Sequence, residues 1–281
     1  LSKGSMDKLQ ILRLANNHQI GDKGLEAFAG ALSKGAMPTL KTLVMDKFEI
    51  RDGDNTSLDL TNKGLNDTNM KIIAHLFANG SLPALTELKL SFNQFGSTGL
   101  EAFAGALSKG ALAQLQNLWL NRNQISDAGL ASLADAFAKG SLAQCTSLNL
   151  MGNQFGDTGL EAFAGALSKG SLDNLVTLNL DCNQIGDAGL ISLADSLSKG
   201  AMPALKTLVM DKFAIRDGGV AWLDLTNKGL NDTDMKIIAH LFANGSLARL
   251  KELYLLGNSV SQQSKDNLKS AMANTGCKIY F

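Results

Sequence analysis

The chain has 281 residues, with 26 Lys plus Arg against 26 Asp plus Glu, so its formal net charge is zero. This balance argues against nucleic-acid binding or attachment to an anionic membrane surface, which both need an excess of basic residues. No apolar run approaches the roughly 20 residues of a membrane span, and three scattered cysteines are typical of a reducing compartment, so we expect an intracellular protein, in the cytoplasm or in an organelle, without membrane insertion.

The first residues already belong to a repeat. Residues 1–4 read LSKG, which matches the end of the string GLEAFAGALSKG that starts at Gly24, Gly99 and Gly159. Because an uncapped solenoid end exposes apolar surface, we expect the natural protein to extend further in the N-terminal direction. The sequence therefore predicts a single repeat domain over residues 1–281 that is an N-terminally incomplete fragment.

A second frame, LxxLxLxxN, recurs every 30 residues in the middle of the chain. It starts at Leu85, Leu115 and Leu175, and at Cys145, which takes the first leucine position of its copy. The LxL core alternates with period 2, as a short strand does, and the stretch after it carries apolar residues at helical spacing. Each unit is therefore predicted to be a strand, a turn, a helix and a turn, with stacked units sharing one core.

The predicted helices carry signals at both ends. Asp127, Asp157 and Asp187 precede equivalent helices, where a carboxylate accepts from free N–H groups and complements the helix dipole. Thr98 and Glu101 have the spacing of a capping box. Recurring Lys-Gly pairs are typical of helix C-termini.

An asparagine closes each leucine frame. Because its side chain is expected to turn back toward the end of the strand, we predict that it hydrogen-bonds backbone groups rather than a ligand. This column comprises Asn93, Asn123, Asn153, Asn183 and Asn258.

Two segments break the 30-residue step. Regular frames lie 45 residues apart between Leu40 and Leu85, and again between Leu205 and Leu250. Each break is predicted to hold a full unit plus a half unit of strand and loop without a helix. A notch or a loop-covered patch is then expected on the helix side.

The two breaks are near copies of each other, offset by 165 residues, which indicates an internal duplication. Phe48 and Phe213 replace the ladder asparagine in these units and are expected to fill the gap. Residues 261–281, a polar helix-like stretch followed by a closing strand, are predicted to form a C-terminal cap.

These motifs resemble the ribonuclease-inhibitor-like class of leucine-rich repeats, whose pattern LxxLxLxxNxIGDxGLxxLA is matched by residues 175–194. Ribonuclease inhibitors, the sensor regions of NOD-like receptors and Ran GTPase-activating proteins share this architecture. The resemblance implies an α/β solenoid curved like a horseshoe, with a parallel β-sheet on the concave face and helices on the convex face. It covers nearly the whole chain and implies protein binding, but it does not identify a partner.

Candidate catalytic or metal-binding groups are sparse. His75 and His240 occupy equivalent positions in the duplicated segments and are interpreted as surface or half-buried helix residues. The acidic loop at Asp52 lacks the carboxylates of a calcium site. Cys145 is interpreted as a buried apolar residue, and nothing near Cys182 predicts a reactive thiol. We therefore predict no enzymatic activity, no cofactor and no metal.

The concave face carries the residue types that recur in binding hot spots. We predict that it holds two clusters, one over the middle strands and one near the C-terminal end. The predicted partner-binding residues are Lys89, Phe92, Trp119, Arg122, Met151, Trp222, Tyr254 and Leu256.

The leading functional hypothesis is a protein–protein interaction module or scaffold that binds a partner protein on this face. One alternative is a structural subunit of a large assembly, which would use the convex helical face with its small residues at Gly105 and Gly165. The other is a small-GTPase-activating protein resembling the Ran regulator, although the acidic tail of that family is absent here. The sequence leaves the identity of the partner and the oligomeric state open.

Overall fold

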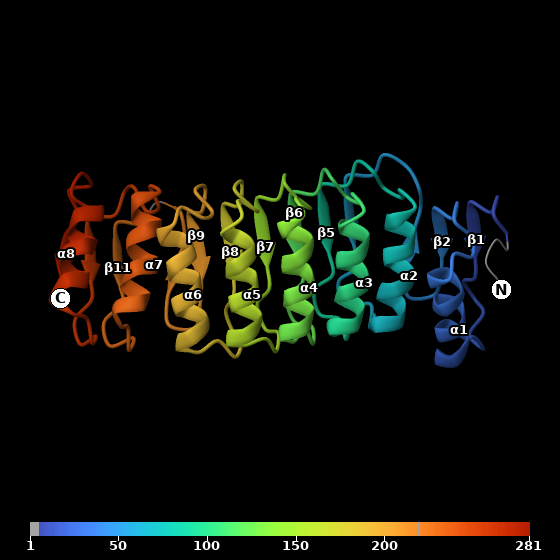
Figure 1. Ribbon diagram of the computed structural model, residues 1–281, viewed down its shortest axis with the longest axis horizontal. Helices are drawn as coiled ribbons and strands as arrows, with labels where there is room; N and C mark the ends of the chain where they lie inside the picture. The colour runs from blue at the N-terminus through green and yellow to red at the C-terminus, as the bar shows by residue number, and fades with distance from the viewer. Residues whose placement is uncertain (1–5, 219) are drawn as a thin grey trace.

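The computed structural model describes residues 6–218 and 220–281. Strands and helices alternate along the chain, and the helices stand side by side in one row with the strands behind them (Figure 1). The described elements are β1 (Ile11–Arg13), α1 (Asp22–Ser33), β2 (Thr42–Val44), β3 (Glu49–Ile50), β4 (Ser57–Asp59), α2 (Asp67–Ala78), β5 (Glu87–Lys89), α3 (Ser97–Leu107), β6 (Asn117–Trp119), α4 (Asp127–Ala138), β7 (Ser147–Asn149), α5 (Asp157–Leu167), β8 (Thr177–Asn179), α6 (Asp187–Ser198), β9 (Thr207–Val209), β10 (Ala214–Ile215), β11 (Trp222–Asp224), α7 (Asp232–Ala243), β12 (Glu252–Tyr254), α8 (Gln262–Ala271) and β13 (Lys278–Tyr280).

The core lies between the strand layer and the helix layer. The middle residue of the central strands points into it, and Leu88, Leu118, Leu148 and Leu178 are fully buried. Burial of each such side chain stabilises the fold by about 1.5–3 kcal/mol. Phenylalanines on the helices complete the packing, with Phe137 and Phe163 in an edge-to-face contact at 6.2 Å between ring centroids.

Neighbouring parallel strands pair in an unshifted register, so that equivalent residues of successive repeats form straight columns. Trp119, for example, lies between Lys89 and Asn149. The strands form three sheets: β1-β2-β3, β10-β9-β8-β7-β6-β5-β4, and β11-β12-β13. Successive repeats pair in parallel within each sheet, as predicted.

The sheet is interrupted at the two 45-residue breaks. The helix is missing between β2 and β4, and between β9 and β11, as the spacing predicts. A tight hairpin replaces it: β3 pairs antiparallel with β2, and β10 pairs antiparallel with β9. Phe48 and Phe213 are buried at the hairpin turns and pack into the hydrophobic core there.

At the starts of several helices, the free backbone N–H groups are hydrogen-bonded by a side chain of the neighbouring repeat rather than by a local capping box. The box predicted for Thr98 and Glu101 does not form, because α3 begins two residues earlier than that box requires, at Ser97, with Gly96 as its N-cap. Oδ1 of Asp67, the first residue of α2, instead accepts from the backbone N–H groups of Gly96 and Gly99 at 2.7 and 2.9 Å. Each aspartate of this kind therefore caps the helix of the next repeat.

Asp127 and Asp157 make the same inter-repeat contact, Asp127 with Gly156 and Gly159, and Asp157 with Gly186 and Gly189. Asp187 precedes the second break, where no helix follows at the regular distance, and its carboxylate lies 3.8 Å from Lys212 Nζ instead.

None of the helices in the described parts of the chain has the length and apolar character needed to cross a bilayer.

Candidate functional site

The strands present two columns of outward side chains, from their first and third residues, on the side away from the helices. These columns, together with the second and third residues after each strand, are called the sheet face below. Each predicted partner-binding residue lies on this face, but the structure does not gather them into two compact patches.

The best-defined group on the sheet face is centred on Trp119, the third residue of β6. The side chain of Trp119 is 38% exposed. The Lys89 ammonium on β5 lies 5.6 Å from the ring centroid, and it also lies 3.4 Å from the Glu87 carboxylate. An ammonium over an indole face contributes about 0.5–1 kcal/mol at an exposed site. The lysine therefore covers part of the indole, and the rest of the side chain is open to solvent.

Phe92 and Arg122 follow their strands by three residues and share a column. Both have left-handed backbones, with φ of 57° and 58°, and Phe92 is 53% exposed. A Cβ atom at Gly152 would lie 2.9 Å from Arg122 Cδ, so the arginine side chain crosses the glycine of the next repeat. Met151 is half-buried beside them, and its carbonyl accepts from the N–H of Arg122 at 2.8 Å.

The C-terminal group contains a residue that sequence reasoning missed. Tyr254 stacks on Tyr280 at 4.7 Å with an interplanar angle of 10°, and its hydroxyl donates to Glu252, which raises the pKa of Tyr254. Trp222, at 64% exposure, lies beside Glu252 in the register, and Leu256 is 45% exposed. Tyr280 could have been identified as part of this group from its position, because it is the third residue of β13 and pairs directly with Tyr254.

One group in the described residues brings three potential metal-ligating atoms within 4.8 Å of one another: Asp181, Cys182 and Asp211. The N–H of Cys182 donates to Asp211 Oδ1 at 2.5 Å. Loss of solvent and the neighbouring charges of Asp181 and Asp211 raise the pKa of the Cys182 thiol. The thiolate is therefore disfavoured, so this group does not form an activated nucleophile.

The other candidate groups have structural roles in the fold. Burial raises the pKa of Cys145 to about 12. Asp52 is paired with Lys41 at 3.7 Å. The predicted asparagine ladder is confirmed, since Asn123 Nδ2 donates to the carbonyls of Leu90 and Leu120, both at 3.0 Å, and the other ladder asparagines repeat the contact.

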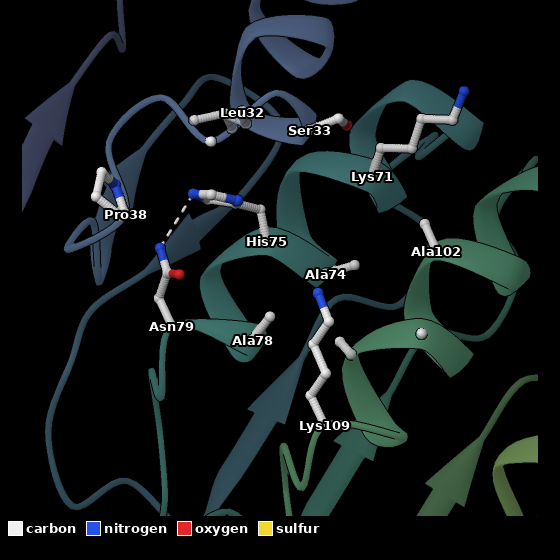
Figure 2. A pocket seen from close by; sticks show the side chains of 13 residues that line it. Leu32, Ser33, Pro38, Lys71, Ala74, His75, Ala78, Asn79, Ala102 and Lys109 are labelled. Carbon is white, nitrogen blue, oxygen red and sulfur yellow. Dashed lines mark hydrogen bonds between the residues drawn. The ribbon is translucent and has the colours of Figure 1, made fainter. Parts of the chain in front are cut away.

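A pocket of about 440 Å³ lies on the helix side at the first break, where the sequence predicts a notch. Figure 2 shows His75 and Asn79 of α2 facing the Pro38 loop, with Lys109 of α3 on the other side. Asn79 Nδ2 lies 3.0 Å from His75 Nε2, and burial lowers the pKa of His75. His75 is thus a half-buried helix residue in a hydrogen-bonded pair, as expected.

A family model supports the repeat assignment in five segments of the chain. The family model for the leucine-rich repeat matches residues 7–29, 82–104, 115–134, 146–164 and 172–194. Internalin C2 from Listeria monocytogenes is 21% identical, with coverage of 80% of this chain and 79% of that chain and a TM-score of 0.36. The internalin inlF of the same organism is 17% identical, with coverage of 87% and 81% and a TM-score of 0.30. No curated protein matches the chain.

Stacked strand–helix units that share a leucine core and an asparagine ladder define a solenoid protein. The matched segments are similar to leucine-rich repeats, and the fold of the described residues is that of a leucine-rich-repeat solenoid.

Proposed function

We propose that this chain is a protein-binding module that holds a partner protein on its sheet face. The observation that carries the proposal is the exposed Trp119, fixed by Lys89, with Phe92 exposed in the preceding repeat. Trp, Tyr and Arg dominate binding hot spots because they bury a large area and also form directed polar contacts. Trp222, Leu256 and the Tyr254–Tyr280 stack extend the proposed surface toward the C-terminus.

The same features favour binding over catalysis. The sheet face in the described residues presents aromatic, amide and mixed-charge side chains, and none of its thiols has a lowered pKa. We also propose that the repeats are of the ribonuclease-inhibitor-like class, because each regular unit carries a full helix of 11 or 12 residues after its strand.

The test is an affinity capture with a variant that removes the central side chains and retains the backbone. Each replacement copies the equivalent residue of another repeat: Phe92→Asn as at Asn62, Trp119→Asn as at Asn149, and Arg122→Gly as at Gly152. Asn62 and Gly152 already adopt left-handed conformations, with φ of 55° and 67°. The triple variant is therefore expected to fold, as circular dichroism will check.

We expect the wild-type chain to capture a protein that the triple variant loses. The matched control is Ile191→Ala on α6, an exposed apolar residue on the helix side, which should leave capture unchanged. Capture by the triple variant of the same proteins as the wild type would contradict a contact at Trp119. Loss of capture in Ile191→Ala alone would favour the helical face and a structural-subunit role.

A further inference from the structure

The second break contains a small pocket at the C-terminal ends of β8 and β9, called the strand-end pocket below. Its volume is about 150 Å³, roughly five times the ~30 Å³ that a water molecule occupies in the liquid. Five of its eight lining residues are apolar, and the other three are charged. The lining residues are Leu180, Ile185, Leu190, Met210, Asp211, Lys212, Phe213 and Asp234.

Asp234 places a buried carboxylate against this cavity, with a side chain only 1% exposed. Oδ2 accepts from the N–H of Asn231 at 2.9 Å and from Lys212 Nζ at 3.3 Å. Oδ1 has no hydrogen-bond partner among the groups that the structure describes. A buried charge with an unmet acceptor is costly, so this oxygen favours a donor or a cation from outside the chain.

The charges around the pocket favour the same kind of ligand. Asp211 lies in the lining, and Lys212 Nζ lies 3.8 Å from Asp187 and 3.3 Å from Asp234, so three carboxylates lie in or beside the lining. Lys212 is the single basic residue in the described lining. The site therefore carries net negative charge and attracts cations rather than anions.

The duplicated segment supplies a built-in comparison. Asn69 occupies the place of Asp234 in the first copy, beside a smaller pocket of about 110 Å³ that Phe48 and Lys47 also line. Asn69 Oδ1 accepts from the N–H of Asn66 at 3.1 Å, so an amide maintains the same helix cap. Lys47 donates to a backbone carbonyl instead. A carboxylate at this position is thus not required by the fold.

We propose that the strand-end pocket binds a primary alkylammonium group, with the ammonium on Asp234 Oδ1 and the aliphatic stem between Leu190, Met210 and Phe213. A hydrated metal ion fits this cavity poorly, because its walls offer few oxygen ligands. A four-carbon stem with one terminal charge matches both the apolar walls and the single acceptor. Two sources share this chemistry: the side chain of a lysine on another protein, and a free small amine.

The experiment is a titration followed by the methyl resonances of Ile185, Met210 and the lining leucines in the full chain. The two ammonium probes are n-butylammonium and a minimal peptide, lysine acetylated on its α-amino group and amidated at its carboxyl group, which keeps a free side-chain ammonium. The uncharged counterpart is n-butanol. We expect methyl shifts with an ammonium probe and about 10-fold weaker binding of the alcohol, because the alcohol lacks the charge-assisted hydrogen bond. Binding by the peptide alone or by the small amine alone identifies the source.

Asp234→Asn is the decisive variant, because the first copy demonstrates that asparagine preserves the cap. We expect it to weaken ammonium binding about 10- to 100-fold without loss of folded structure. Trp119→Asn is the matched control and should leave binding unchanged, which separates this site from the sheet face. Absence of methyl shifts with both ammonium probes, equal binding of the alcohol, or unchanged affinity in Asp234→Asn would each overturn the proposal.

Discussion

Asn153 shows how one side chain connects two repeats. Its Nδ2 donates to the carbonyls of Leu120 and Leu150 at 3.1 and 2.9 Å, and its Oδ1 accepts from the N–H of Ile125 at 3.2 Å. Its partners are buried, so water cannot replace the amide if it is removed.

Asn153→Ala should therefore lower the free energy of unfolding by about 1–3 kcal/mol, because it leaves the buried N–H of Ile125 without a partner. The carbonyls of Leu120 and Leu150 each lose one of two ladder donors and keep the other, from Asn123 and Asn183. Urea unfolding followed by circular dichroism measures the change. Gln154→Ala, at the exposed neighbouring position, is the control and should change the free energy by less than about 0.5 kcal/mol. Similar midpoints for the two variants would show that the ladder contributes little.

Sequence reasoning identified the ladder asparagines because their spacing recurs, and it missed Asp234 for a related reason. A recurring residue reveals a structural column, whereas Asp234 matters through its difference from Asn69, its counterpart in the other copy. The residues predicted to bind a partner lie on the sheet face, since strand period fixes which residues project outward. Their contacts could not be predicted, because they depend on side-chain direction, as the path of Arg122 over Gly152 illustrates.

The two helix histidines link stability to pH. Burial lowers the pKa of both His75 and His240 below the ordinary value of 6.5, so the unfolded chain binds more protons than the folded chain below about pH 7. Stability then rises with pH in this range and falls as the pH drops from 7.5 to 5.5. The raised pKa of Asp211 acts in the opposite direction at lower pH.

Replacement of both histidines, as His75→Gln with His240→Gln, should reduce the loss of stability between pH 7.5 and 5.5. Thermal unfolding of the wild type and the double variant at matched pH values provides the measurement, and Asp211 contributes equally to both proteins. Parallel curves of melting temperature against pH would contradict this assignment.

At the scale of the elements, the inter-repeat cap explains why a glycine recurs near the start of each regular helix. A Cβ atom at Gly159 would lie 2.7 Å from Asp127 Oδ1, which must approach the backbone N–H there. Gly165, in the same helix α5, faces open space, with nothing within 4 Å of a Cβ atom. One glycine is therefore required by packing, and the other only lowers the helix propensity.

Gly159→Ala and Gly165→Ala should consequently shift stability in opposite directions. We expect Gly159→Ala to destabilise the protein by about 1–3 kcal/mol through overpacking. Gly165→Ala should stabilise it by about 0.5–1 kcal/mol, because alanine is the better helix former. Thermal unfolding of the two variants measures both effects, and a change of the same sign in both would refute the role of the Asp127 contact.

The helices and strands were predictable because their apolar periods repeat, but the caps and sheet edges were not. The spacing of Thr98 and Glu101 indicates a local capping box, yet Asp67, about 30 residues earlier, caps that helix instead. The antiparallel strand β10 was also missed. Two residues, Ala214 and Ile215, are too few to show an alternating pattern.

The whole molecule is three strand-paired segments joined by packed helices. Pairing is absent between β3 and β4, and between β10 and β11, in the sheets formed by the described residues. Side chains bridge the first break instead, as when Ser81 Oγ donates to the Lys41 carbonyl at 2.8 Å. In a solenoid each repeat is stabilised by its neighbours, so cooperativity should be weakest at these two breaks.

The two tryptophans provide separate reporters, since Trp119 lies in the central sheet and Trp222 in the C-terminal sheet. In the Trp222→Phe variant the fluorescence comes from Trp119 alone, and in the Trp119→Phe variant it comes from Trp222 alone. We expect the Trp222 signal to change at a urea concentration lower by on the order of 0.5 M, because the C-terminal segment has one neighbouring segment and the central segment has two. Circular dichroism of both variants controls for any effect of the substitutions themselves on stability. Coincident fluorescence transitions would mean that helix packing across the break between β10 and β11 couples the segments fully, so that the interrupted sheet does not divide the solenoid into separate folding units.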